Sequence, residues 1–378
     1  MGWSLAVERR ADRGTFTVGS LDQGGRRSSA SRKDAEDDVT REARLGSLSR
    51  QSDVAARCVV TRLYMSDLVT LGESMAVMSS TQFGALSAVR DFELSIAGAE
   101  SNVAIGISRL GRTATWIGRV GNDPFGEKIV RTLRGEGVEV VRIVDSSAPT
   151  GMMIKEHRTV DRSNVYYYRK GSAGSRLCAE DVMPTLFTNA RIVHVTGITA
   201  GLSASSRKAV ERAIELARSV GALVSFDVNY RKAVWTEEEA APVLWSLASR
   251  SDVVFAGKRE AALLGAGPGA RRMAIELSKA WAARVVVMSG QGGAVAAEAD
   301  SVVERTAAAV GIIDTIGAGD AFVAGFLHAL LDGEGVDECL ARGTATAGVS
   351  IGSHGDWEGL PNLTEVRRFW EDSDAVDR

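Results

Sequence analysis

The sequence predicts an α/β protein with a central, mostly parallel sheet, helices on both faces of that sheet, and a smaller second sheet. Apolar segments of strand length alternate with helical segments between residues 191 and 288. This alternation is typical of a parallel sheet that is covered on both sides. Segments that alternate apolar and polar residues, within residues 73–97 and 149–171, predict the smaller sheet. Glycines and charged residues follow the apolar strands, and parallel sheets bind ligands at the carboxyl ends of their strands.

Composition indicates a soluble globular protein and excludes several classes of function. The chain has 378 residues, of which 45% are hydrophobic and 25% are charged, as in ordinary globular domains. The net charge of −3 gives no basis for nucleic-acid or membrane partners. Cys58, Cys178 and Cys339 have neither metal-ligand nor disulfide-framework spacing, which fits a reducing cytoplasm. We find no signal peptide and no apolar run of membrane-spanning length, so we expect a cytoplasmic location.

Residues 1–64 differ from the rest of the chain. Polar and charged residues without periodicity, such as residues 24–38, cannot bury enough apolar surface to offset the conformational entropy of the chain. We therefore predict a disordered N-terminal extension, followed by one folded domain at residues 65–378. Two explanations of the extension stay open: it is a regulatory tail, or the natural start of the protein is Met65.

The folded part begins with elements of both sheets. A turn at residues 97–102 is expected to open the first helix, and Gly111 is expected to end it. In chain order we predict strands at residues 68–73, 92–96 and 115–121, and helices at residues 103–110 and from 122 to 133.

The second half alternates strictly between strands and helices, which predicts the parallel sheet. We expect strands at residues 192–196, 223–227, 253–256 and 285–288. We expect helices at residues 205–219, 237–249, 259–264 and 270–281.

Residues 314–320, with the sequence DTIGAGD, precede a helix that is apolar on nearly all sides until His328. Gly317 and Gly319 permit backbone angles and close approaches that a Cβ atom would prevent. The first amides of a helix lack internal partners, and together with the helix dipole they favour a bound anion. Asp320, in that first turn, could accept a proton from a hydroxyl that attacks a phosphoryl group. For so short a motif, an ordinary loop-to-helix junction is the alternative.

Other candidate sites depend on their neighbours. Residues 289–294, with the sequence SGQGGA, form either a glycine-rich hairpin turn or the wall of a nucleotide site. Arg169 and Arg231 stand at strand ends, and guanidinium groups suit a substrate carboxylate, although both could be ordinary surface arginines. The chain has no P-loop motif. The four histidines show no metal-ligand spacing, and His194, between valines on a core strand, is expected to be structural.

Two separated stretches carry a resemblance to a known family. The first lies within residues 98–126 and includes GAESNVA and GRVGNDPFG, and the second is DTIGAGDAF at residues 314–322. Through these stretches the chain resembles the ribokinase-like PfkB sugar kinases, over about residues 65–365. Within that family it is most similar to the 2-keto-3-deoxygluconate kinases. That narrower match lies in residues 167–173, 195–199, 226–235 and 355–361.

The resemblance implies a role for each matching residue. Asp320 is the general base, and the backbone of Gly317, Ala318 and Gly319 is the anion hole. The residues that hold the sugar acid are Gly98, Asn102, Tyr167, Arg169, Arg231 and Asp356. The residues that hold ATP are Ser289, Gly290, Gln291, Gly292, Gly293, Ala294 and Thr344. Glu260 acts on Mg²⁺ through water, and Asp314 is a candidate ligand of a monovalent cation.

The resemblance thus implies ATP-dependent phosphorylation of the terminal hydroxyl of a 2-keto-3-deoxy sugar acid. The small sheet would act as a lid, and pairing of lid edges would make a homo-oligomer. Two positions depart from the family pattern: Gly257 replaces a polar residue, and Met153 replaces a tyrosine. The alternatives are a kinase for a neutral sugar such as fructose or ribose, and a non-catalytic binding protein with the same fold.

Overall fold

The computed structural model describes residues 66–159, 162–307 and 311–376. These residues belong to one compact unit that spans Val59–Arg378. The N-terminal extension predicted at residues 1–64, and the alternative start at Met65, lie outside the described residues. Among the helices that are described, none is long and apolar enough to cross a bilayer.

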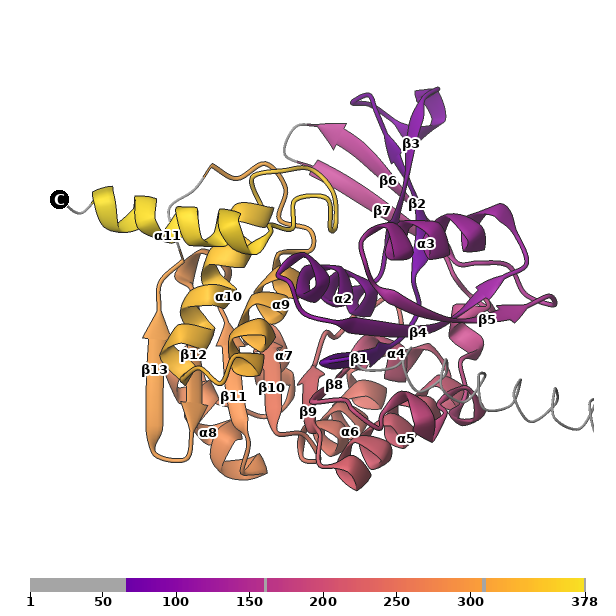
Figure 1. Ribbon diagram of the computed structural model, residues 1–378. Helices are drawn as coiled ribbons and strands as arrows, with labels where there is room; N and C mark the ends of the chain where they lie inside the picture. Colours follow the sequence, from indigo (N-terminus) through magenta and orange to yellow (C-terminus); the bar gives the residue numbers. More distant parts are fainter. Residues whose placement is uncertain (1–65, 160–161, 308–310, 377–378) are drawn as a thin grey trace, which may run out of the picture. The chain divides into compact units, whose positions relative to one another are not determined.

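Within the described residues, the central sheet contains nine strands in the order β13-β12-β11-β10-β9-β8-β1-β4-β5 (Figure 1). From β11 to β5, neighbouring strands are parallel, whereas β12 and β13 are antiparallel. This mostly parallel sheet confirms the predicted fold class. Its strands are β1 (Leu68–Leu71), β4 (Ala114–Gly121), β5 (Glu139–Asp145), β8 (Ile192–Thr196), β9 (Leu223–Asp227), β10 (Val253–Gly257), β11 (Arg284–Met288), β12 (Ala294–Glu298) and β13 (Ser301–Arg305).

Helices cover both faces of this sheet, as its apolar strands require. On β10, Val254 and Ala256 belong to one buried cluster and Val253 and Phe255 to the other, because successive strand residues point to opposite faces. The first cluster includes helices α5 (Ala204–Val220), α6 (Glu237–Ala248), α7 (Lys258–Leu263) and α8 (Ala270–Trp281). The second includes α2 (Ala99–Arg109), α3 (Pro124–Gly135), α9 (Ala318–Leu331) and α10 (Val336–Ser350). The other α-helices of the described residues are α4 (Gly197–Leu202), whose Ala200 belongs to the first cluster, and α11 (Leu363–Val376).

The second sheet has the strand order β3-β2-β6-β7 and projects from the top of the central domain (Figure 1). Its strands are β2 (Met75–Ser80), β3 (Phe92–Ala97), β6 (Met152–Thr159) and β7 (Arg162–Tyr168). They fall within the residues predicted for a lid. The buried core of this sheet is small, and consists of Met75, Val77, Ala97 and Met153. A sheet with so little apolar burial depends on contacts with the rest of the protein for its order.

Several predicted boundaries differ from the structure by one or two residues, and the largest error is at the start of the first helix. The first helix, α2, begins at Ala99 rather than Val103. Its first turn holds the polar residues that the sequence analysis placed in a turn. They are accommodated by partners distant in sequence: Thr196 and Thr199 donate hydrogen bonds to the buried Glu100 carboxylate. Tertiary partners therefore overrode the local polar signal.

Candidate active site

Helix α9 begins at the DTIGAGD motif, and its first turn borders a cavity. Gly317 precedes the helix with a φ of 76°, in the left-handed region that favours glycine. A Cβ atom at Gly317 would collide with the carbonyl oxygen of Asp356, so this close approach requires glycine. The amides of Gly319 and Asp320 fall in the first turn, where they have no acceptor within the helix. Residues 321–329 are buried, as their apolar sequence predicts.

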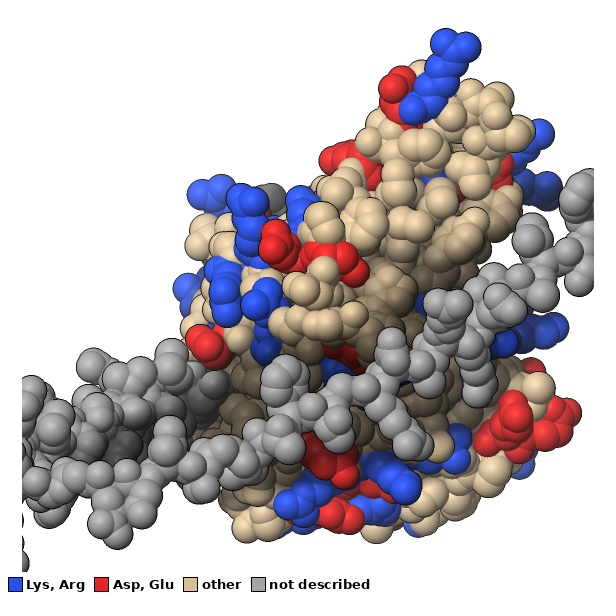
Figure 2. All heavy atoms as spheres, turned by 90° about the vertical axis from the view of Figure 1, so that its right-hand side faces the viewer, with Lys and Arg blue, Asp and Glu red and all other residues tan. Residues whose placement is uncertain are grey.

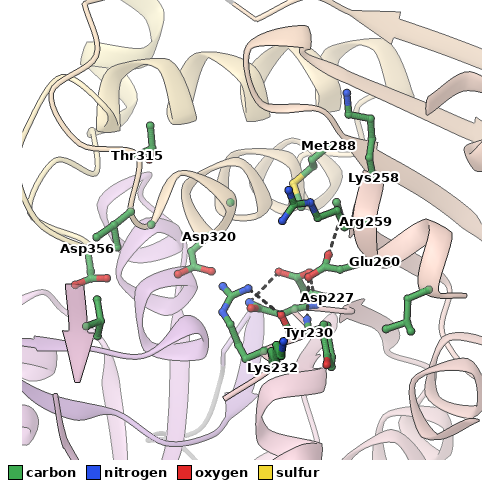
Figure 3. A pocket seen from close by; sticks show the side chains of 18 of the residues that line it. Asp227, Tyr230, Lys232, Lys258, Arg259, Glu260, Met288, Thr315, Asp320 and Asp356 are labelled. Carbon is green, nitrogen blue, oxygen red and sulfur yellow. Dashed lines mark hydrogen bonds between the residues drawn. The ribbon is translucent and has the colours of Figure 1, made fainter. Parts of the chain in front are cut away.

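Asp320 faces a cavity of about 870 Å³ (Figure 3). Burial raises the pKa of the Asp320 carboxyl to about 7, and the nearby Asp356 adds to the rise. Two groups oppose it: Asn102 Nδ2 donates a hydrogen bond of 2.8 Å to Asp320 Oδ2, and the positive charge of Arg231 favours the carboxylate. Asp320 is therefore poised to exchange a proton near neutral pH, which suits a general base.

Two more acids lie at this cavity, Asp227 at the end of β9 and Glu260 on α7 (Figure 3). Burial raises the pKa of Asp227, and the neighbouring Glu260 and Asp320 carboxylates raise it further. Burial also raises the pKa of Glu260, whose two oxygens accept hydrogen bonds from the amides of Tyr230 at 2.8 Å and Gly257 at 2.7 Å. Our sequence analysis gave Glu260 a role. Asp227 lies at the end of a predicted strand and within residues 226–235, which carry the family resemblance, but it was given no role.

A second cavity of about 560 Å³ adjoins the first and is lined in part by the smaller sheet. Asp320 and Gly317 line it. So do all the residues predicted to hold a sugar acid, which are Gly98, Asn102, Tyr167, Arg169, Arg231 and Asp356. They come from strand β7 of the smaller sheet, from the start of helix α2 and from loops that are far apart in sequence. The structure thus brings the predicted base and the predicted sugar residues to one space.

The cations at these cavities differ in their partners. Arg169 Nε donates to Glu73 Oε2 at 2.7 Å, and Lys155 Nζ lies 2.6 Å from Asp356 Oδ2. Arg231 donates to the backbone oxygen of Tyr230 at 3.3 Å, and among the described residues it forms no ion pair within 4.0 Å. Glu73 and Lys155 were missed by our sequence analysis. Lys155 stands on the inward face of a lid strand between Met153 and His157, and a charge at such a position is a signal that could have found it.

A third cavity, of about 620 Å³, lies on the other side of Gly319. It is lined by Gly290, Gln291, Gly293 and Thr344 from the predicted ATP residues, together with apolar side chains such as Phe322 and Ile312. Ser289 lines the first cavity instead. Gly292 does not line either space, and Ala294 is buried in β12, so these two predicted residues lie apart from the cavity surface.

Asp314 lines a different cavity from Asp227, Glu260 and Asp320. Its oxygens accept hydrogen bonds from the amides of Ile316 at 3.0 Å and Gly355 at 3.4 Å. It lines a fourth cavity of about 350 Å³, which contains His157 and His354 but not Glu260. Among the residues that the structure describes, no three His, Cys, Asp or Glu side chains are grouped as metal ligands would be.

Charged side chains of both signs are mixed on the described surface that Figure 2 shows. Blue and red groups are mixed over its lower part, whereas blue groups predominate along its left edge. This mixture fits the small net charge of −3.

Comparisons with known proteins show the family of this chain. The sequence pattern of the pfkB family carbohydrate kinases matches residues 65–363. The chain is 34% identical over 307 residues to a 2-dehydro-3-deoxygluconokinase of Bacillus subtilis, which covers 80% of this chain and 95% of that protein. It is 33% identical over 317 residues to a 2-dehydro-3-deoxygalactonokinase of Haloferax volcanii, which covers 83% and 99%. The crystal structure of a PfkB protein from Polaromonas sp. JS666 matches with a TM-score of 0.73 and 32% identity, covering 80% of this chain and 99% of that one. The chain therefore belongs to the pfkB family of carbohydrate kinases.

Proposed function

We propose that this protein transfers a phosphoryl group from ATP to the terminal hydroxyl of a 2-keto-3-deoxy sugar acid. The observation that carries the proposal is the position of Asp320. Its carboxylate lies at the first turn of α9, has a pKa of about 7, and faces a cavity that Arg169 and Arg231 also line. The names of the similar gluconokinase and galactonokinase support this class of substrate.

The residues at the third cavity fit a nucleotide. Its apolar lining, with Phe322 and Ile312, suits a base, and Gly319 connects it to the cavity of Asp320. The hydroxyl of Ser289 is buried without a partner in the described residues, which leaves a donor for a bound group. We infer that residues 289–293 and Thr344 hold ATP. When bound, ATP with Mg²⁺ supplies the phosphoryl group and neutralises part of its charge.

The residues of the chain would then act as follows. Asp320 accepts the proton of the sugar hydroxyl, while Asn102 fixes the orientation of its carboxylate through the 2.8 Å hydrogen bond. The free amides at the start of α9 hold the oxygens of the migrating phosphoryl group. Glu260, held by two amides, orients water around Mg²⁺. Asp314 is the candidate ligand of a monovalent cation, and it would not contact the reacting atoms.

The test of this proposal is Asp320→Asn. The variant should bind both ligands nearly normally and lose roughly two to four orders of magnitude in turnover, the usual contribution of a general base. Asp337→Asn is the matched control, because Asp337 also occupies the first turn of a helix but pairs with Arg305 at the surface. Near-normal turnover of Asp320→Asn, or an equal loss in the control, would exclude Asp320 as the base.

A kinase for a neutral sugar is the second candidate. It is favoured by the ion pairs of Arg169 with Glu73 and of Lys155 with Asp356, which balance two of the cations at the cavity. A coupled ADP-release assay with 2-keto-3-deoxygluconate, 2-keto-3-deoxygalactonate, fructose and ribose separates the candidates. If the protein prefers fructose or ribose, a neutral sugar takes the place of the sugar acid as the proposed substrate.

We also propose that two copies pair through their lids. β3 and β7 are the edges of the lid sheet, and most residues of β7 are exposed. Unpaired edges are covered in stable proteins, and a second copy would cover them. Light scattering of the purified protein tests this; a monomer at micromolar concentration would contradict it.

A further inference from the structure

The guanidinium of Arg169 is bound from behind by a buried carboxylate. Arg169 Nε donates to Glu73 Oε2 at 2.7 Å, and Nη2 lies 2.5 Å from the same oxygen. The Glu73 side chain is 0% exposed and that of Arg169 is 13% exposed. Both residues line the cavity of about 560 Å³ that contains Asp320. One edge of the guanidinium is therefore committed to Glu73, and the remaining N–H groups, on Nη1 and Nη2, are left for a ligand.

The surroundings of Glu73 hold it in one place. Ser172 donates a hydrogen bond to its other oxygen, Oε1. A Cβ atom at Gly151 or at Gly174 would collide with the Glu73 side chain, so both glycines leave the space that it fills. A buried carboxylate with a fixed ion pair and a fixed hydroxyl donor is a preorganised group, and it transmits that order to Arg169.

Arg231 differs from Arg169 in its exposure and in its hydrogen-bond partner. It is exposed, and the structure gives it a backbone oxygen rather than a carboxylate as hydrogen-bond partner. It lines the same cavity as Arg169. The charge of Arg231 acts on Asp227, Glu260 and Asp320, but none of these carboxylates forms a direct ion pair with it among the described residues. Most of its N–H groups therefore remain available to an anionic ligand, whereas one edge of the Arg169 guanidinium is held by Glu73.

We propose that Glu73 is a positioning and specificity residue of the sugar site, which fixes Arg169 as a directional hydrogen-bond donor and balances its charge. Arg231 then supplies the charge that recognises the carboxylate of the substrate. This inference rests on the proposed function, and it assigns different tasks to the two arginines. Arg169 contributes to binding of acidic and neutral sugars alike, whereas Arg231 distinguishes between them.

The experiment compares 2-keto-3-deoxygluconate with its carboxamide, which has the same shape without the charge. Calorimetry gives the Kd of both ligands for the wild type, Glu73→Gln, Arg169→Met and Arg231→Met. Glu156→Gln is the matched control, because Glu156 is a buried, hydrogen-bonded glutamate of the lid that does not line the cavity of about 560 Å³.

The expected pattern is specific to each variant. The preference for the acid is the Kd of the carboxamide divided by the Kd of the acid. Arg231→Met should lower this ratio by roughly 10- to 100-fold, the usual contribution of a charge-assisted contact. Arg169→Met should weaken both ligands, and should lower the preference for the acid less than Arg231→Met does, because it removes a balanced charge and leaves only the Glu73 carboxylate to oppose the acid. Glu73→Gln should raise the preference for the acid by roughly fivefold or more, because the charge of Arg169 is no longer balanced. Glu156→Gln should resemble the wild type.

The inference is overturned if Glu73→Gln keeps the wild-type Kd for both ligands, or if Arg169→Met abolishes the preference and Arg231→Met does not. The two arginine variants decide the matter alone if Glu73→Gln does not fold. Turnover of the sugar acid by the wild type is measured alongside. Absence of turnover refutes the proposed function, whereas turnover with a reversed pattern of preferences refutes only the inference about Glu73.

Discussion

Removing the charge of Lys155 should loosen the contact between the lid and the central domain. Lys155 lies on β6 of the lid and is 3% exposed, and its partner Asp356 is 10% exposed. Their charged atoms are 2.6 Å apart. Asp356 also packs its carbonyl oxygen against Gly317, at the start of α9. One ion pair thus connects the lid to the motif that borders the proposed reaction site.

The magnitude follows from burial. Removing one partner of a buried pair costs about 3–5 kcal/mol, because the other charge is left uncompensated. Asp356 borders the cavities, where water can reach it, so we expect roughly 2–3 kcal/mol for Lys155→Met. That corresponds to roughly a 30- to 150-fold increase in the opening equilibrium of the lid. The lid core of four buried residues is too small to compensate for such a loss.

Amide hydrogen exchange along β2 and β6 measures the effect, since these strands pair within the lid. Arg158→Met is the matched control, because Arg158 is on the same strand but exposed. Lys155→Met combined with Asp356→Leu should recover much of the protection, since the double variant leaves no buried charge. Exchange in Lys155→Met within about twofold of the control, or no recovery in the double variant, would refute the electrostatic reasoning.

Two further predictions concern pH. The value of kcat/KM should rise with pH through an apparent pKa near 7, since Asp320 must be ionised to act as base. Arg231→Met should move this rise to higher pH, because Arg231 lowers the pKa of Asp320. A flat profile from about pH 6 to 8 would contradict the assignment. Burial lowers the pKa of His194 to about 3, so the imidazole stays neutral in the folded protein. In the unfolded chain its pKa is about 6.5. The free energy of unfolding should therefore fall as pH drops from about 6.5 toward 3, by up to about 5 kcal/mol. Urea unfolding of His194→Asn should show a flatter dependence over that range, and an unchanged slope would exclude His194 as the cause.

Much of the fold could be predicted because local patterns there agree with the tertiary structure. The boundaries expected for β8, β9 and α8 match those observed, since each is a short apolar or amphipathic run between clear turn residues. The burial of α9 follows directly from its apolar sequence. The start of α2 did not follow, because the buried Glu100 is satisfied by hydroxyl groups of Thr196 and Thr199, which are distant in sequence.

The sequence by itself determined the α/β class, the glycines and the acid at the start of α9, and the residue types that could bind a sugar acid. Tertiary structure alone decided which of these groups share a cavity and which charges are already balanced. The pairing of Arg169 with Glu73 joins residues 96 positions apart, and that of Lys155 with Asp356 joins residues 201 positions apart. The physical reason is that burial and ion pairing depend on distances in space, and the spacing of residues along the chain does not determine these distances.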